Sequence, residues 1–553
     1  MEICKPEIVF ENIKKERIFA IDLETSDIDI RKGNIQLVSL ATKNTQTAFE
    51  PWEYLPQLRE ILNQENYISI FHNAKFDLNF LRQAGINVKC RIFDTMVADW
   101  LLDENKKKYG LKKLVREYLP DHEVIEFDEV DGLFSKGLRY YAALDARNTY
   151  DLYEYLYPKL ESEDLTNEYW TIESPIVRII ADIEYTGIRL DEPYLKSLLD
   201  KASVEIDEIT NDLKRNYGDI NYESPQQLAE LLFKKMKFKP IKENQTGYSV
   251  DKETLETLGR QTGHEIFKKL LRLRAIQKLK NTFLEPLAGF GEFVYPSYSQ
   301  TGTVTGRFSS SNPNFQNMPR GDELPEYKVR RAFIPREGNV FICIDFSQIE
   351  LRMTAHYSHD TEMMRAYIND EDIHQKTADA CGCSRQDAKS LNFGLIYNMQ
   401  AGTLAKRLGV SFEQASEFRK RFFETYRGVR HLYKKMEEVL QHRKWIRLLS
   451  GRKRRFNFDK KITSHDIGKA VNSLIQGSSA DLMKIAMVKL VEKYPDIQII
   501  GQVHDELLIE CPKDEAQERA EAYKEIMETA VKLRVPVKAN YVICSHSWQE
   551  AKS

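Results

Sequence analysis

Features that would place a protein outside the cell interior are missing from this sequence. No stretch of its 553 residues approaches the roughly 18 consecutive apolar residues that a membrane span needs. The first residues, MEICKPEIVFENIKKE, lack the apolar core of a signal peptide. The seven cysteines are scattered, and no second pair or histidine cluster joins Cys381 and Cys383 in a zinc site. We therefore expect an intracellular, cytoplasmic protein with reduced thiols and no membrane contact.

A strong net charge is missing as well. The chain has 81 Lys and Arg residues against 84 Asp and Glu residues, so its formal net charge is −3. This balance alone argues against a nucleic-acid partner. Two segments without any acidic residue weaken this argument. Lys268–Lys280 contains six basic residues, and His442–Phe456 contains seven. A charge run is usually a solvated surface, so both nucleic-acid contact and plain solvent exposure stay open.

The length and patterning predict a multidomain protein of α/β and α+β type. At roughly 100–200 residues per domain, the chain corresponds to about three to five domains, and 42% hydrophobic residues exclude wholesale disorder. Strand signals lie at Ile18–Leu23, Ile35–Leu40, Tyr67–Phe71, Asn339–Asp345 and Ile497–Glu510. The first two segments predict a hairpin in an α/β unit that ends near residue 158, and the last predicts another hairpin. Helical periodicity dominates 160–295 and 360–490.

Three motifs in the first 145 residues contain carboxylates. Asp22 and Glu24 end an apolar strand and share one of its faces, so both can reach one ion. About 13 such acid-x-acid pairs arise by chance at this composition, so the pair alone means little. A motif N-x-x-x-D ends at Asp77, and Tyr141 and Asp145 are neighbours on one face of a predicted helix. The alternative interpretation is a set of ordinary surface acids.

In type, order and separation these motifs resemble the DEDD exonucleases that carry a tyrosine, the proofreading type. The resemblance implies that Asp22, Glu24, Asp77 and Asp145 bind two Mg²⁺ ions, or Mn²⁺ in their place, and that Tyr141 orients the attacking water. Two such ions about 4 Å apart activate a water and stabilise a leaving 3′ oxygen. Hard carboxylate oxygens suit Mg²⁺.

A second pair of acids lies in the C-terminal half. Asp345 comes at the end of an apolar strand, and His504, Asp505 and Glu506 interrupt an apolar hairpin. Carboxylates between apolar strands cost desolvation free energy unless a cation compensates them. Asp345 and Asp505 therefore indicate a minimal two-metal site for phosphoryl transfer.

Four residues spaced by four lie between these acids: Arg385, Lys389, Phe393 and Tyr397. Each step of four advances about 400°, so on a helix they share one stripe. An ordinary amphipathic helix is the alternative. Two cations followed by two aromatics suit a triphosphate at one end and a base at the other.

With these acids and this stripe, the segments Thr303–Asn317 (TVTGRFSSSNPNFQN) and Asn472–Gly477 (NSLIQG) and the C-terminal Trp548 resemble the family A DNA polymerases, the class of the large fragment of bacterial DNA polymerase I. The resemblance covers nearly the whole chain. It implies a ribonuclease H-like 3′→5′ exonuclease domain followed by a right-hand polymerase with palm, fingers and thumb. The implied units are 1–158 (exonuclease), 159–297 (N-terminal part of the polymerase and thumb), 298–360 (first part of the palm), 361–490 (fingers and adjoining palm) and 491–553 (catalytic hairpin and C-terminus).

The resemblance also implies roles for matched positions. Asp345, Phe346 and Asp505 would belong to a site for two further Mg²⁺ ions, with Glu506 and Lys389 as catalytic neighbours. Glu350 would exclude a 2′-hydroxyl, Phe393 would stack on the incoming nucleotide and Tyr397 would guard the template position. The full set for the dNTP is Arg385, Lys389, Phe393, Tyr397, Glu350, His374 and Gln348. The set for DNA is Arg307, Asn314, Gln316, Asn472, Gln476, His504, Lys268, Lys269, Arg272, Arg452 and Arg454.

The expected enzyme adds dNMPs to a primer 3′ end, releases pyrophosphate and proofreads, in DNA replication or repair. Its partners would be primer–template DNA, dNTPs and a single-stranded 3′ end, with the chain acting as a monomer. Only 21 residues precede Asp22, so we expect no 5′-nuclease domain. The alternatives are a non-catalytic scaffold, a single-subunit RNA polymerase, and a nuclease with an inert polymerase half.

Three positions depart from the family pattern. Phe346 replaces a tyrosine, Asn398 stands where a glycine follows Tyr397, and Gly468 stands where an arginine precedes Asn472 by four positions. None of them is a predicted metal-binding carboxylate. They bear on template handling and fidelity.

Overall fold

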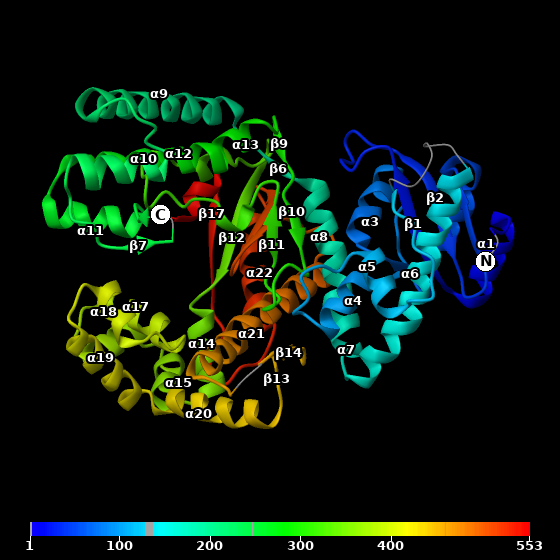
Figure 1. Ribbon diagram of the computed structural model, residues 1–553. Coiled ribbons are helices and arrows are strands. Elements are labelled where there is room, and N and C mark those ends of the chain that lie inside the picture. Colours follow the sequence, from blue (N-terminus) through cyan, green and yellow to red (C-terminus); the bar gives the residue numbers. More distant parts are fainter. Residues whose placement is uncertain (1–2, 128–135, 246, 459–460, 553) are drawn as a thin grey trace.

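The computed structural model describes residues 3–127, 136–245, 247–458 and 461–552. Figure 1 shows a blue and cyan N-terminal unit on one side and a larger unit built around a second, central sheet on the other. No helix within the described ranges is long and apolar enough to cross a membrane.

The N-terminal unit is an α/β domain around one five-stranded sheet. Its strands run in the order β3-β2-β1-β4-β5, antiparallel from β3 to β1 and parallel from β1 to β5. The bounds are Ile18–Thr25 (β1), Ile35–Ala41 (β2), Gln46–Phe49 (β3), Ile68–Phe71 (β4) and Arg91–Asp94 (β5). The antiparallel pairing of β1 with β2 confirms the predicted hairpin.

Helices cover this sheet and connect it to the rest of the chain. They are Pro6–Glu16 (α1), Leu55–Leu62 (α2), Ala74–Gln83 (α3), Thr95–Leu102 (α4), Leu111–Tyr118 (α5), Lys136–Ser162 (α6) and Thr166–Glu168 (α7). The long α6 packs across β1, β2 and β3. Because α6 continues to Ser162, the predicted domain boundary at 158 falls inside a helix.

The next segment is almost wholly helical. Its first helix packs between the N-terminal unit and the central sheet, and the later helices form the thumb-like lobe at the upper left of Figure 1. The helices are Ser174–Thr186 (α8), Glu192–Tyr217 (α9), Pro225–Ala229 (α10), Lys252–Thr262 (α11), Glu265–Leu279 (α12) and Glu285–Ala288 (α13). Short strand pairs join Ile188–Arg189 (β6) to Phe293–Val294 (β9) and Glu243–Asn244 (β7) to Gly247–Tyr248 (β8). α9, α11 and α12 enclose an apolar core of their own.

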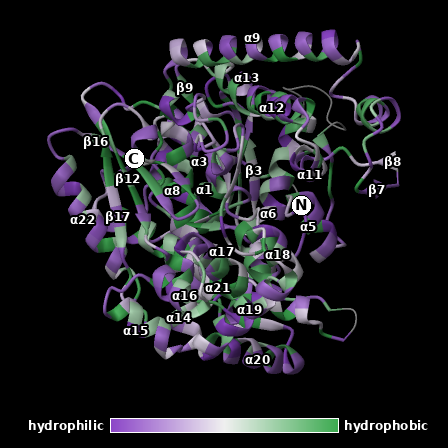
Figure 2. Ribbon diagram, turned by 90° about the vertical axis from the view of Figure 1, so that its left-hand side faces the viewer, coloured by the Kyte–Doolittle hydropathy of each residue, from purple (hydrophilic) through white to green (hydrophobic). Residues whose placement is uncertain are grey.

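The central sheet has four antiparallel strands in the order β15-β16-β12-β17. Its strands are Asn339–Phe346 (β12), Gln498–Val503 (β15), Glu506–Pro512 (β16) and Ala539–Cys544 (β17), and a small pair, Ser297–Ser299 (β10) and Ser309–Ser311 (β11), lies beside them. Ser464–Lys493 (α21) and Ala516–Thr529 (α22) pack with this sheet in the largest apolar core. Figure 2 shows the hydrophobic residues concentrated along these strands.

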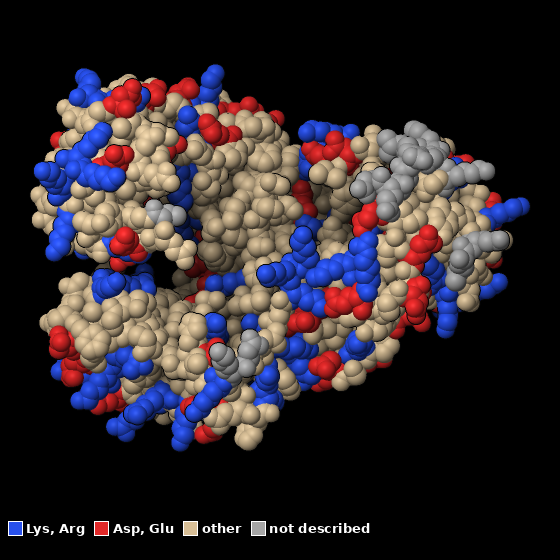
Figure 3. Space-filling view, viewed as in Figure 1, with Lys and Arg blue, Asp and Glu red and all other residues tan. Residues whose placement is uncertain are grey.

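Helices between β12 and α21 form a finger-like lobe with a separate core. They are Ile349–Ser358 (α14), Thr361–Ile368 (α15), Ile373–Cys381 (α16), Arg385–Ile396 (α17), Ala401–Leu408 (α18), Phe412–Thr425 (α19) and Arg427–His442 (α20). A hollow separates this lobe from the thumb-like lobe, with basic side chains on its lower rim (Figure 3).

The mostly helical pattern expected for 360–490 is interrupted by one strand pair. The strands Trp445–Arg447 (β13) and Lys453–Arg455 (β14) form a hairpin inside the basic window. Its turn contains Gly451 at φ +100°, a backbone conformation that glycine adopts without a steric penalty.

Candidate active sites

The four exonuclease-type carboxylates come from one strand and two helices. Asp22 and Glu24 lie on β1, Asp77 on α3 and Asp145 on α6. Asp77 and Asp145 are 3% and 7% exposed. The start of α3 is fixed by Asp94, whose carboxylate accepts the backbone N–H groups of residues 73 (3.2 Å) and 74 (2.8 Å). The structure therefore brings the four predicted acids to one side of the sheet on rigid elements.

Burial and mutual repulsion dominate the electrostatics of this site. Burial raises the pKa of Asp22 well above its usual range, and Glu24, Asp77 and Asp145 raise it further. Burial and then Asp145 raise the pKa of Glu24 to about 7, and burial raises the pKa of Asp145 to about 6. Burial likewise raises the pKa of Asp77 well above its usual range. Burial raises the pKa of all four acids, and neighbouring carboxylates raise the pKa values of Asp22 and Glu24 further, so they form a donor set whose charge a divalent cation would relieve.

The carboxylates do not converge tightly. Within the described ranges, no three His, Cys, Asp or Glu side chains are close enough together to count as a ready-made metal site. Repulsion between like charges opposes a closer approach.

The tyrosine of this site has a partner that the motifs did not reveal. Tyr141 and Asp145 lie one turn apart on α6 and are hydrogen-bonded. The Lys112 ammonium on α5 donates to the Tyr141 hydroxyl oxygen at 2.8 Å and lies 3.9 Å from an Asp145 carboxylate oxygen. Lys112 belongs to no acid motif, so only an expected cation near the carboxylates could have pointed to it.

The second pair of acids lies at one end of the central sheet. Asp345 on β12 faces Glu506 on β16 in register, and Asp505 occupies the turn between β15 and β16. The N–H of Phe346 donates to the main-chain oxygen of Asp505 at 3.1 Å, and His504 makes the turn at φ +55°. Backbone pairing therefore joins two acids that are 160 positions apart.

Cations moderate the charge of these acids. Burial raises the pKa of Asp505 to about 6, while Arg307 and Arg320 lower it. Asp345 as a whole residue is exposed at the end of the strand. Partial burial of its carboxylate raises its pKa, and the negative charge of Glu506 raises it further. Trp548 donates its indole N–H to Glu506 at 2.6 Å, and this bond orients the Glu506 carboxylate.

The predicted place of Phe346 in the metal site can involve only its main chain. Its ring is buried at 3% exposure and contains no atom that can bind a metal ion. Only its main-chain carbonyl could contact a cation at this site.

A carboxylate clamp lies beside Asp505. Arg307 donates to one oxygen of Glu350 at 2.5 Å, and the Tyr397 hydroxyl donates to the other. Gln476 hydrogen-bonds Tyr397 from α21. Residues from four separate segments therefore meet at Glu350, which is the residue predicted to discriminate sugars.

The predicted stripe forms on α17, with Tyr397 directly after the end of the helix. Ser384 caps the helix by accepting the N–H of Asp387. Lys389 is exposed, Arg385 pairs with Asp372 at 2.7 Å, and the helix ends at Ile396, directly before Tyr397. The stripe is therefore confirmed as helical geometry.

Other predicted contacts lie around the stripe and the turn. His374 is buried, and its ring bonds the side chain of Asn392 at 2.9 Å. Gln348 accepts the Tyr367 hydroxyl at 3.1 Å. The Gln316 side chain stabilises the turn between β15 and β16 by accepting the N–H of His504 at 3.0 Å.

The predicted DNA contacts differ in accessibility. Asn314 is exposed, and the side-chain oxygen of Asn472 is buried without a hydrogen-bond partner among the described residues. In the thumb-like lobe, Lys268 is exposed, whereas Lys269 pairs with Asp212 and Glu265. Arg272 likewise pairs with two acids, Glu205 and Glu326. Lys269 and Arg272 are therefore paired with acids from outside the basic window, whereas Lys268 is exposed, and DNA contact by these residues stays a prediction.

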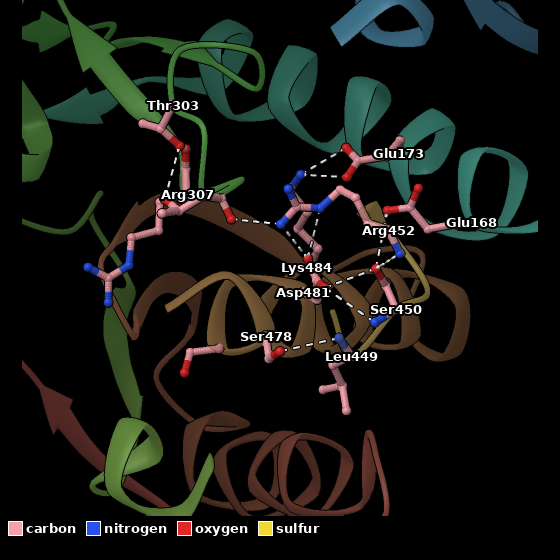
Figure 4. Close-up of polar contacts among 12 residues, drawn as sticks. Glu168, Glu173, Thr303, Arg307, Leu449, Ser450, Arg452, Ser478, Asp481 and Lys484 are labelled. Carbon is pink, nitrogen blue, oxygen red and sulfur yellow. Dashed lines mark hydrogen bonds and ion pairs between the residues drawn. The ribbon is translucent and has the colours of Figure 1, made fainter. Parts of the chain in front are cut away.

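The prediction of DNA contact is wrong for Arg452. Its side chain is 1% exposed and pairs with Asp481 of α21 at 2.9 Å (Figure 4). A buried guanidinium cannot reach a phosphate on the surface. A second buried pair, Lys484 with Glu173 at 2.7 Å, lies nearby in the same view.

The prediction is also wrong for Arg454, because the β13–β14 hairpin docks on the N-terminal unit. Arg454 and Arg455 pair with Glu104 at 2.9 and 3.1 Å, and Lys453 pairs with Glu163 at 2.6 Å. The Glu104 side chain is 2% exposed, so this contact is an interdomain interface. Glu104 lies 350 positions from Arg454, so a local reading of the sequence cannot reveal that this basic run forms an interface.

Two family models match the chain over these same units. The model described as DNA polymerase family A matches residues 192–550, and the one described as 3′-5′ exonuclease matches residues 4–161. DNA polymerase I of Borreliella burgdorferi is 34% identical over 587 residues, covering 98% of this chain and 63% of that protein. DNA polymerase I of Treponema pallidum is 35% identical over 580 residues, covering 96% and 57%. The chain thus spans less than two thirds of the length of either relative.

A solved structure covers the whole chain. It is the POL domain of Pol1 from M. smegmatis in complex with a DNA primer-template and dNTP, with a TM-score of 0.91 and 25% sequence identity over 100% of both chains. The arrangement of exonuclease-type unit, thumb, palm and fingers is therefore shared with that structure.

Proposed function

The chain belongs to DNA polymerase family A, and from this premise we propose that it is a DNA-templated DNA polymerase with an intrinsic 3′→5′ proofreading exonuclease. One observation carries the proposal. The turn with Asp505, the strand end with Asp345 and the Glu350 clamp lie together, in the same chain as four clustered carboxylates beside a tyrosine. Relatives named DNA polymerase I support it.

In polymerisation, the primer 3′ oxygen forms a bond to the α-phosphorus of a dNTP, its proton passes to water, and the bond to the pyrophosphate oxygen breaks. Asp345, Asp505 and the main-chain carbonyl of Phe346 would hold Mg²⁺. Two bound ions supply charge neutralisation at the attacking and leaving oxygens. Lys389 and Arg385 would contact the phosphates, and Arg385 would exchange its partner Asp372 for the triphosphate.

Selection of deoxynucleotides would rest on the clamp. Glu350 is held from two sides by Arg307 and Tyr397, so its carboxylate cannot swing away from an incoming sugar. A 2′-hydroxyl would have to displace one of these donors or leave buried polar atoms unpaired. Phe393, next to the clamp on α17, would stack on the base and sugar.

In proofreading, water attacks the last phosphodiester, a new P–O bond forms and the bond to the 3′ oxygen of the penultimate nucleotide breaks. Asp22, Glu24, Asp77 and Asp145 would hold two divalent ions. The hydroxyl of Tyr141 would orient the water, because it lies one helical turn from Asp145 and bonds it.

We propose primer–template DNA, dNTPs and a single-stranded 3′ end as partners, and a single chain as the working unit in replication or repair. The hollow between thumb and fingers suits a duplex, and the enclosed acids of the N-terminal unit suit a strand end (Figure 3). Cysteines that form no disulfide among the described residues suit a reducing compartment.

The deciding experiment is extension of a primer with a mismatched 3′ end, with and without Mg²⁺. The expected result is removal of the mismatch followed by templated incorporation of dNTPs, and neither reaction after chelation. Degradation without incorporation would point to a nuclease with an inert polymerase half, and incorporation of rNTPs in preference to dNTPs would point to an RNA polymerase. Absence of both reactions would favour a scaffold.

A further inference from the structure

Lys112 brings a positive charge into the exonuclease-type site. Its side chain is 19% exposed and extends from α5 toward α6. Its ammonium lies 2.8 Å from the Tyr141 hydroxyl, 3.9 Å from Asp145 and 4.3 Å above the centre of the Tyr141 ring. Contacts with two side chains, Tyr141 and Asp145, therefore hold one cation against the residue predicted to orient water.

We propose that Lys112 is a positioning residue of the exonuclease, which fixes the direction in which the Tyr141 hydroxyl donates. A phenol has one proton and two lone pairs. Because the ammonium occupies a lone pair, the single proton must point elsewhere, toward Asp145 or a water beside it. The proposal rests on the proofreading function proposed above and goes beyond it by adding a residue that no motif contained.

The neighbouring lysine provides a matched control. Lys113 follows Lys112 on α5 but is exposed and donates only to the main-chain oxygen of Lys108, at 3.3 Å. Both positions share helix, charge and side-chain length. They differ in the contact with Tyr141.

The test measures single-turnover degradation of a single-stranded DNA 3′ end by the full chain with Mg²⁺. Lys112→Met should lower the maximal rate by about 10- to 100-fold, with a smaller change in KM. Lys113→Met should degrade DNA at the wild-type rate. Primer extension by the same preparations checks that each variant is folded. A wild-type rate for Lys112→Met would overturn the proposal.

A double-mutant cycle with Tyr141→Phe separates positioning from an independent role. If Lys112 acts through the hydroxyl, Lys112→Met combined with Tyr141→Phe should be no slower than Tyr141→Phe alone. If the double variant instead shows the product of the two single-variant rate reductions, the proposal is overturned. Lys112→Arg, which keeps a cation at the site, should retain more rate than Lys112→Met, and equal loss in both would also overturn it. Absence of degradation by the wild-type chain would instead refute the proposed function.

A different contact carries a second inference, at the interface in Figure 4. Arg452 donates to the main-chain oxygen of Thr305 at 2.7 Å. Gly306, at φ +84°, approaches so closely that an added Cβ would lie 2.5 Å from the Arg452 guanidinium. The loop that contains Arg307 therefore packs closely against the Arg452 side chain.

The exonuclease-type unit holds the same loop. Trp100 on α4 donates its indole N–H to the Thr303 oxygen at 3.2 Å, and the Arg452 guanidinium lies 5.2 Å from the Trp100 ring centre. The Thr303 hydroxyl donates to the Arg307 main-chain oxygen at 2.7 Å. We infer that Arg452 and Trp100 are positioning residues for Arg307, so that the exonuclease unit helps to shape the polymerase site.

The test compares primer-extension kinetics of Trp100→Phe and Arg452→Lys, with Arg455→Gln as control. Arg455 lies in the same interface and pairs with Glu104 and Glu163 without touching the loop. Both test variants should lower kcat/KM for dNTP incorporation by about 10-fold, since small misplacements of a positioning side chain cost rate. Arg455→Gln should extend normally.

Arg307→Ala completes the cycle. The double variant Arg307→Ala, Trp100→Phe should incorporate dNTPs with the same kcat/KM as Arg307→Ala alone. Unchanged extension by Trp100→Phe, or multiplication of the two effects, would overturn the inference. Trp100→Phe keeps an aromatic ring at this buried site while removing the indole N–H together with the fused five-membered ring, so this arm is informative even if Arg452→Lys is unstable.

Discussion

The two carboxylate sites of this chain use the same residue types in different surroundings. In the exonuclease unit, Asp77 and Asp145 are buried, and burial followed by neighbouring acids raises the pKa of Asp22. In the palm, Asp345 is exposed, and two arginines oppose the rise in the pKa of Asp505 that burial and neighbouring acids cause. An enclosed site suits one strand end, whereas an open one suits a duplex and a nucleotide that arrive together.

Their origins in the chain differ as well. The exonuclease acids lie within about 125 positions of one another, on β1, α3 and α6 of one α/β unit. The palm acids meet only because β12 pairs with β16. The first site is therefore a product of local topology, and the second depends on long-range strand pairing.

Replacing Asp345 or Asp505 by Ala should give the largest effect, because each change removes a cation-binding carboxylate from the open site alone. We expect extension to fall by about 1,000-fold or more. Degradation of a single-stranded 3′ end should continue at the wild-type rate. Unimpaired dNTP incorporation by either variant would contradict the assignment of the open site.

The reciprocal change acts on the enclosed site. The double variant Asp22→Ala, Glu24→Ala should lose about 100- to 1,000-fold in 3′-end degradation and keep extension. A gel assay on a primer with a mismatched end measures both activities. Persistent removal of the mismatch would show that the two sites are not separate.

The clamp at Glu350 tests how the open site selects its substrate. Glu350→Ala should reduce discrimination against rNTPs by about 10- to 100-fold, because the carboxylate that excludes the 2′-hydroxyl is gone. Tyr397→Phe, which removes one donor to Glu350, should cause a smaller loss. The ratio of kcat/KM for dNTP and rNTP measures the effect, and an unchanged ratio in Glu350→Ala would argue against the gate.

The smallest expected effect concerns stability. Burial raises the pKa values of Asp22 and Glu24, so the folded state binds protons more tightly than the unfolded state. The corresponding stabilisation is complete below the ordinary pKa near 4 and is lost as the pH rises through about 7. Without divalent ions, wild-type protein should therefore lose more melting temperature between pH 6 and pH 8 than the double variant Asp22→Ala, Glu24→Ala, by a few degrees.

Addition of Mg²⁺ provides the control for that measurement. A cation bound among ionised carboxylates stabilises the folded state. It should raise the melting temperature of the wild type at pH 8 more than that of the double variant. Equal shifts in both proteins would place the stabilising ion elsewhere.

Several elements could be predicted because their signals are local. The β1–β2 hairpin follows from two apolar runs around a polar turn, and the α17 stripe follows from a spacing of four. The acids of both sites were found through short motifs, and the family models match the same regions. Side-chain periodicity of strands and helices is a property of neighbouring residues, so it can be read along the chain.

Partners of charged residues could not be predicted. Arg452 and Arg454 lie in a window without acids, yet Asp481 and Glu104 neutralise them from other elements. Lys269 and Arg272 meet acids outside their own window in the same way. Electrostatic pairing depends on distance in space, which the order of residues does not encode locally.

The sequence by itself determined which chemistry the chain can perform, since carboxylates, a tyrosine and a cationic stripe define the reactive groups wherever they lie. Only the tertiary structure decided which charges serve that chemistry. It buried Arg452 in an interface, placed Lys112 against Tyr141 and clamped Glu350 between Arg307 and Tyr397. The physical reason is that a side chain's charge, protonation and reach are set by neighbours that folding brings from hundreds of positions away.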